Sequence, residues 1–95
     1  EGHTDDKPIP MNSKFRNNWE LSSARSLNLV QRLSELAEMD EHYFSALGYG
    51  EFRPKIDLKN IKDRVKLEEA RAENRRVELY FDAFIKSKNE SLENI

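Results

Sequence analysis

The sequence predicts a small α/β fold of the α+β kind, a two-layer sandwich in which helices cover one face of a small sheet. Apolar residues recur at helical spacing over residues 19–39 and, less strongly, over 56–73. Apolar and polar residues alternate over 75–84, which is typical of a strand, and residues 1–4 and 42–47 predict two shorter strands. The predicted order is therefore strand, helix, strand, helix, strand.

Length and composition limit the chain to one small domain with a short tail. Of its 95 residues, 37% are hydrophobic and 36% are charged, which is enough for a thin core. The net charge of -2 provides no strong field toward nucleic acid or an anionic membrane. The absence of cysteine excludes disulfides and thiol chemistry. We expect the domain to cover residues 1–85 and a polar C-terminal tail to cover 86–95.

The N-terminal third predicts a strand end, a loop and a helix. Residues 1–4 predict the last part of a strand, and Pro8 and Pro10 oppose regular structure in the loop over 5–17. Asn18 is a good N-cap for the following helix, roughly Trp19 to Met39. One face of that helix carries Leu29, Leu33 and Leu36.

The rest of the chain predicts a turn, a charged helix and a last strand. Two glycines in Gly48-Tyr49-Gly50 allow positive φ, but neither a following Lys-Ser/Thr pair nor a GxGxxG pattern marks a phosphate cradle. The helix over 56–73 has a basic half, which could indicate nucleic-acid binding. Interleaved acidic residues and the lack of an aromatic platform favour a solvated face instead.

Catalytic and metal-binding interpretations are weak. His3, Asp5 and Ser22 could suggest a nucleophilic triad, but no nucleophile elbow surrounds Ser22. His3 with the adjacent Asp5 and Asp6 makes a poor coordination set, and His42 is isolated. We therefore expect no enzyme activity, no catalytic residue, no cofactor and no metal.

Asp5 and Arg25 form the strongest candidate site. A carboxylate can hold an ammonium group, and an arginine can grip a carboxylate with two parallel hydrogen bonds. A small zwitterion that carries both groups would satisfy the two side chains at once. The alternative is an ordinary surface arginine that pairs with Glu20 or Asn28.

Four blocks of residues resemble the OmpA-like peptidoglycan-binding domain, and they follow one another in the order of that family. The blocks are Gly2-His3-Thr4-Asp5, Asn18-x-x-Leu21-Ser22-x-x-Arg25, Gly48-Tyr49-Gly50 with Pro54, and Arg71-Ala72-x-Asn74-Arg75-Arg76-Val77-Glu78. The stretches Asp5-Asp6-x-Pro8-Ile9 and Asn18-Trp19-Glu20-Leu21-Ser22 are more similar to its flagellar stator branch, the MotB type, than to OmpA or the lipoprotein Pal.

The resemblance implies a non-catalytic domain that binds the diaminopimelate of the peptidoglycan stem peptide. It implies that Asp5 holds the ammonium group and Arg25 the carboxylate. It leaves open which arginine of the last block takes part. The residues that it assigns to the peptidoglycan-binding site are Asp5, Arg25, Asn18, Leu21, Thr4, Arg75 and Arg76.

At the level of the whole protein, the resemblance implies a periplasmic domain of an inner-membrane protein. Such a protein would anchor a flagellar motor stator to the cell wall as a homodimer, with an ion-channel subunit as its partner. The family normally has a further strand and helix at the N-terminal end, which we expect upstream of residue 1. An OmpA- or Pal-type envelope tether, a non-flagellar stator-like protein, and a protein-interaction module that uses residues 56–73 remain alternatives.

Overall fold

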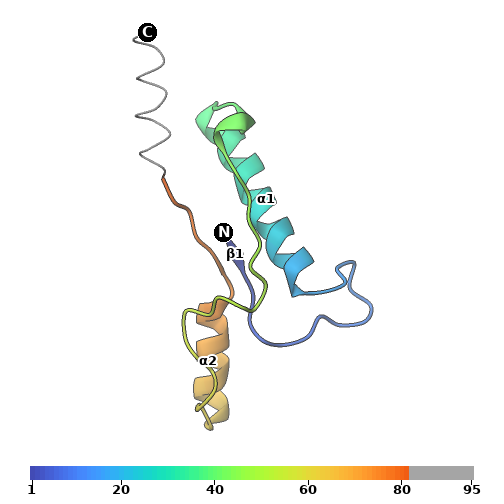
Figure 1. Cartoon of the computed structure of the whole chain (residues 1–95), viewed down its shortest axis with the longest axis vertical. Helices are drawn as coiled ribbons and strands as arrows, with labels where there is room; N and C mark the ends of the chain where they lie inside the picture. The colour runs from blue at the N-terminus through green and yellow to red at the C-terminus, as the bar shows by residue number, and fades with distance from the viewer. Residues whose placement is uncertain (82–95) are drawn as a thin grey trace.

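The computed structural model describes residues 1–81 and has two helices and a small antiparallel sheet (Figure 1). The strands are β1 (Gly2–His3) and β2 (Arg76–Val77). The helices are α1 (Asn18–Ala37), the short 3₁₀ helix η1 (Glu41–Tyr43) and α2 (Arg64–Asn74). This arrangement confirms the predicted α+β class.

The sheet brings the two ends of the described chain together. Gly2 pairs with Val77 and His3 with Arg76 in antiparallel register. On the other side of β1, Gly2 forms a parallel bridge with Gly48. Because β1 lies in the middle, the loop that follows it starts beside the segments around residues 50 and 75.

Helix α1 packs against this sheet through small residues. The side chains of Ser22 and Ser26 are buried, and their hydroxyls accept hydrogen bonds from Gly50 N (2.9 Å) and Leu47 N (3.2 Å). A Cβ on Gly2 would lie 2.0 Å from the backbone oxygen of Ser22, which requires glycine at this contact. Helix and strand therefore approach at backbone distance.

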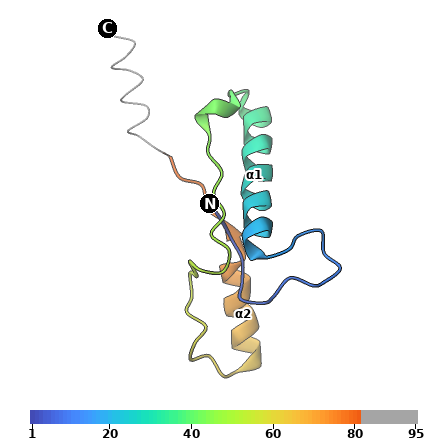
Figure 2. The same ribbon diagram turned by 45° about the vertical axis from the view of Figure 1, so that its right-hand side comes forward.

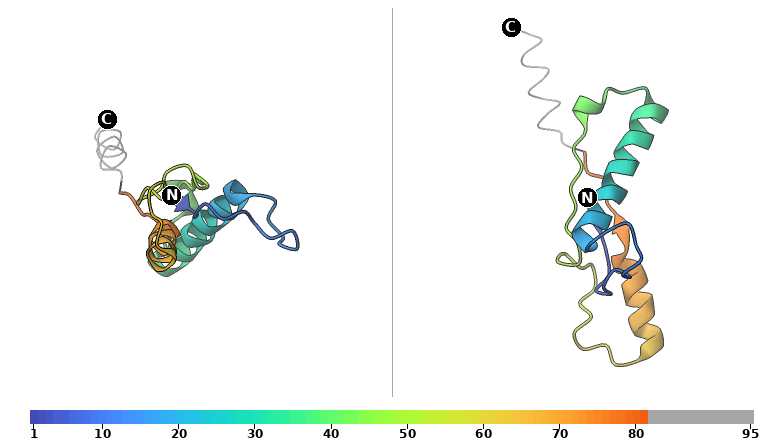
Figure 3. Two further views of the ribbon diagram at one scale, coloured as in Figure 1. Left: turned by 90° about the horizontal axis from the view of Figure 1, so that it is seen from below. Right: turned by 90° about the vertical axis from the view of Figure 1, so that its right-hand side faces the viewer.

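The two helices lie one beyond the other rather than side by side, as Figures 2 and 3 show. The α1 helix covers the sheet, and α2 extends past its end and leads directly into β2. The buried Asn74 at the end of α2 donates to Ile56 O (3.0 Å) and accepts from Ile56 N (2.8 Å). This pair of bonds fixes the preceding loop against the helix.

Three of the predicted elements differ from the structure. Residues 42–47 were expected to form a strand, but they contain the end of η1 and then irregular chain. The Asp40 carboxylate caps η1 through His42 N. The chain reaches β1 only at the bridge of Gly48, where Gly2 N donates to Leu47 O (2.8 Å) and Gly2 O accepts from Tyr49 N (3.0 Å). The second helix begins at Arg64 instead of residue 56, because Asp63 caps it by accepting from Val65 N at 3.0 Å.

The last strand is shorter than the alternation over 75–84 predicts. Only Arg76–Val77 pair as a strand within the described chain, and residues 82–84 lie outside it, as does the predicted tail over 86–95. The first helix agrees closely with its prediction, although its N-cap is Asn17 rather than Asn18. In residues 1–81 no helix has the length and apolar character needed to cross a bilayer.

Candidate functional site

The loop that leaves β1 carries the acidic part of the site. Asp5 is 8% exposed, and its two carboxylate oxygens have different partners. Oδ1 accepts from Lys7 N at 3.0 Å, and Oδ2 accepts from Arg75 Nη1 at 2.7 Å. The carboxylate is therefore held in place by the turn that follows it and by the segment between α2 and β2.

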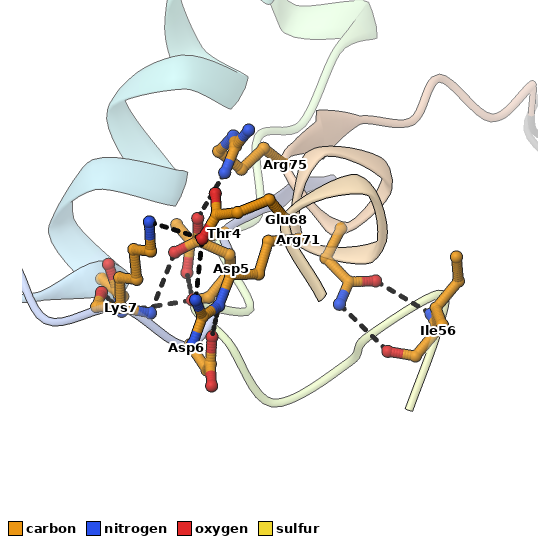
Figure 4. A network of polar contacts seen from close by, with 10 residues as sticks. Thr4, Asp5, Asp6, Lys7, Ile56, Glu68, Arg71 and Arg75 are labelled. Carbon is orange, nitrogen blue, oxygen red and sulfur yellow. Dashed lines mark hydrogen bonds and ion pairs between the residues drawn. The ribbon is translucent and has the colours of Figure 1, made fainter. Parts of the chain in front are cut away.

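The two consecutive arginines after α2 point to different partners. Arg75 reaches Asp5, as Figure 4 shows. Arg76 donates to Arg53 O (3.0 Å) and Asn74 O (3.2 Å), and its Nε lies 3.3 Å from a carboxylate oxygen of Glu78. The sequence left open which arginine takes part, and the structure brings Arg75 to Asp5.

Arg25 lies on the exposed side of α1, in a shallow hollow of about 360 Å³ that it lines with Arg75, Arg76 and Val77. Three guanidinium groups around one hollow favour an anionic guest such as a carboxylate. No hydrogen bond or ion pair joins Arg25 to Asp5 within residues 1–81, so a site formed by these two residues stays a prediction. Arg75 connects them, because it pairs with one and shares a hollow with the other.

A second hollow, of about 310 Å³, has Asp5 in its lining. Its polar lining is mainly acidic and can attract a cation or an ammonium group. The residues that line it are Thr4, Asp5, Asp6, Glu51, Pro54, Asp57, Leu58, Lys59 and Asn74. The candidate site thus has an acidic and a basic hollow, with the Asp5–Arg75 pair at their boundary.

Three further predicted residues lie around the acidic loop. Thr4 is buried and donates from Oγ1 to Asp5 O at 2.9 Å. Asn18, at the start of α1, donates from Nδ2 to Lys7 O (3.1 Å) and Asp5 O (3.5 Å). Leu21 is half-buried one turn further along α1. Thr4 and Asn18 therefore hold the loop that presents the carboxylate.

A second ionic network, missed by the sequence analysis, ties the same loop to α2 (Figure 4). Arg71 donates to Asp6 and to Glu68, both at 2.8 Å, and Lys7 Nζ lies 2.8 Å from Glu68. The hydrogen bonds from Lys7 and Arg71 lower the pKa of Glu68, and those to Asp6 and Glu68 raise the pKa of Arg71. Arg71 belongs to the last of the four blocks that resemble the family. No local sequence pattern indicates that Asp6, 65 residues away, is its partner.

Ser22, considered above as a nucleophile, is fully buried. Its hydroxyl donates to Trp19 O at 3.0 Å and accepts from Gly50 N at 2.9 Å. The side chain therefore joins α1 to the glycine turn.

Two curated proteins are similar to this chain over most of its length. The chain is 44% identical to motility protein B of Bacillus subtilis (strain 168) over 78 residues, which are 82% of the chain and 27% of that protein. This chain is MotB-like. It is also 37% identical to the uncharacterized protein YtxE of the same organism over 79 residues. These residues are 83% of the chain and 29% of that protein.

The MotB-like chain spans between a quarter and a third of the length of these two curated relatives. No protein-family model matches it, and no solved structure matches it. The relationship to motility protein B confirms the prediction of a MotB-like chain, which was based on the Asp5–Ile9 and Asn18–Ser22 stretches.

Proposed function

We propose that this chain is an OmpA-like module that binds peptidoglycan without catalysis, through the zwitterionic end of diaminopimelate. The observation that carries the proposal is the Asp5–Arg75 ion pair at the boundary between the acidic and the basic hollow. A ligand with an ammonium group and a carboxylate on one carbon matches two adjacent hollows of opposite charge.

In the proposed complex, the ammonium group lies beside Asp5 and the ligand carboxylate lies beside Arg25. Arg75 is the third participant, because it can turn from Asp5 toward the same carboxylate once the ammonium group replaces it. The side chain of Arg75 is 39% exposed, whereas that of Asp5 is 11% exposed, so Arg75 is the partner that can turn away. Exchange of this one ion pair for two charge-assisted contacts with a ligand favours the complex.

For the whole protein, we propose the role of a stator anchor. The name of its relative, motility protein B, places that protein in motility, and the match covers most of the present chain. A module fixed to the wall would give an ion-driven stator a stationary point against which to produce torque. The accompanying proposals are a periplasmic position, an inner-membrane anchor elsewhere in the protein, a homodimer, and an ion-channel subunit as partner.

Competition for the wall tests the ligand assignment. We expect a stem peptide that contains diaminopimelate to displace the intact protein from purified peptidoglycan, and the same peptide with lysine at that position to displace it far less. When its α-amino and α-carboxyl groups are in peptide bonds, lysine ends in an ammonium group alone and can fill only the acidic hollow, whereas diaminopimelate keeps both charged groups on its terminal carbon. Equal displacement by the two peptides would contradict the proposed two-ended grip.

A further inference from the structure

A separate cluster of three side chains arises from the pairing of β1 with β2. Glu78 N donates to Glu1 O at 2.8 Å, so the register of the strands continues and places Glu1 opposite Glu78. His3 is two residues after Glu1, and residues two apart in a strand share a face. The two carboxylates and the imidazole therefore lie on one face of the sheet.

Their ligand atoms are close together. His3 Nε2 lies 3.3 Å from Glu78 Oε2 and 3.5 Å from Glu1 Oε1. One potential ligand atom from each of the three residues can be chosen so that all lie within 4.8 Å of one another. Within residues 1–81 this is the one group of three or more histidine and acidic side chains with such spacing.

The imidazole is buried and lacks the hydrogen bonds that a buried polar group requires. His3 is 2% exposed and stacks on Tyr49, with ring centroids 5.3 Å apart. Neither ring nitrogen has a hydrogen-bond partner in the described chain. A buried donor or acceptor without a partner costs about 1–3 kcal/mol, and like charges directly opposite in a sheet add to that cost. A cation between the three groups would give Nε2 a partner and would remove the repulsion between the two carboxylates.

We propose that Glu1, His3 and Glu78 bind a divalent transition-metal ion of the zinc class. With metal–ligand distances of about 2.0–2.2 Å, two ligands of a tetrahedral ion lie about 3.4 Å apart. The two distances from His3 Nε2 match this separation. An imidazole with two carboxylates suits zinc, cobalt or nickel, whereas calcium and magnesium prefer oxygen ligands alone. Water would complete the fourth position.

The neighbours of Glu78 tune the site. The Nε atom of Arg76 lies 3.3 Å from Oε1 of Glu78, the carboxylate oxygen that does not face His3. Tyr80 donates its hydroxyl to Glu78 Oε2 at 3.2 Å, which orients the ligand oxygen. The positive charge of Arg76 opposes a metal ion, which makes the site weaker than one without it. Its bound ion would join β1 to the chain that follows β2.

The test uses the intact natural protein that carries this chain, purified without a polyhistidine tag and stripped with a chelator. It is titrated with zinc by calorimetry, and with cobalt by its visible absorption. We expect Glu78→Gln and Glu1→Gln each to remove one equivalent of zinc or to weaken that site at least about tenfold. These partly exposed side chains can be changed without opening the buried ring of His3.

His42 provides the matched control, because it is the other of the two histidines and lies exposed beside Asp40. His42→Ala should bind zinc and cobalt like the wild type. The site is wrong if the wild type binds no zinc equivalent that both glutamine variants lose. It is also wrong if both variants keep the cobalt absorption of the wild type, since the ion would then be held elsewhere.

Discussion

The Nη1 atom of Arg75 lies 2.7 Å from the Oδ2 atom of Asp5, although the two residues are 70 positions apart. The contact joins the loop after β1 to the segment between α2 and β2. It also joins a residue that lines the acidic hollow, Asp5, to one that lines the basic hollow, Arg75. Arg75 is therefore the side chain that links the acidic half of the candidate site to its basic half.

Replacement of Arg75 should weaken peptidoglycan binding. We expect Arg75→Ala to reduce the affinity roughly tenfold or more, because a hydrogen bond to a charged group contributes about 1.5–3 kcal/mol. Arg75→Lys should restore part of it, since lysine keeps the charge but not the planar fork. Co-sedimentation with purified peptidoglycan measures the effect. Unchanged binding by Arg75→Ala would remove this residue from the site.

Because α1 approaches β1 closely, any side chain at position 2 should lower the free energy of unfolding. Gly2→Ala places a Cβ 2.0 Å from the Ser22 backbone oxygen, so helix and strand must separate. We expect a loss of about 1–3 kcal/mol in the free energy of unfolding, measured in urea. Ser23→Ala, an exposed change on the same helix, should stay within about 0.5 kcal/mol of the wild type. Similar values for both would contradict the backbone contact.

The buried side-chain amide of Asn74 should contribute to the stability of the fold. Asn74→Ala removes two hydrogen bonds to Ile56 and leaves both backbone groups of that residue without these partners. We expect about 1–3 kcal/mol of destabilisation and faster amide exchange at Ile56. Asn60→Ala, in the exposed part of the same loop, is the control and should change neither quantity.

The ionic network around Arg71 should make the stability of the fold depend on pH. Hydrogen bonds from Lys7 and Arg71 lower the pKa of Glu68 below 4.5, its ordinary value. A lowered pKa stabilises the fold above the unfolded value, and this stabilisation disappears as the pH falls through the folded value. Melting temperatures between about pH 7 and about pH 3 should therefore differ between wild type and Glu68→Gln at neutral pH and converge in acid. A constant difference would contradict this role.

Local signals predicted the parts of the fold that depend on near neighbours. The helix after Asn17 has an N-cap, the acidic Glu20 in its first turn and a regular apolar pattern, and it was placed to within two residues at its C-terminal end. The segment over 42–47 has the apolar content of a strand. Its backbone nevertheless follows the Asp40 cap into a 3₁₀ turn, and it meets β1 only at its last residue, where Leu47 O accepts from Gly2 N beside the Gly48 bridge.

Long-range pairing was the part that the sequence could not supply. The motif that contains Arg75 and Arg76 offered two similar side chains, and only the fold shows that Arg75 reaches Asp5 while Arg76 reaches Arg53. Likewise, the leucine stripe of α1 predicted its packed face, yet its buried positions are Ser22, Ser26 and Ser34, and Leu36 is 71% exposed. Close packing on glycines selects small side chains there, which hydrophobic periodicity does not detect.

The most direct test of the central proposal is co-sedimentation of Asp5→Ala and Arg25→Ala with purified peptidoglycan. Both variants should stay in the supernatant while retaining the circular dichroism of the wild type. Arg32→Ala, an exposed arginine two turns beyond Arg25 on α1, should sediment like the wild type. If folded Arg25→Ala or Asp5→Ala sediments like the wild type, these charges do not hold the wall.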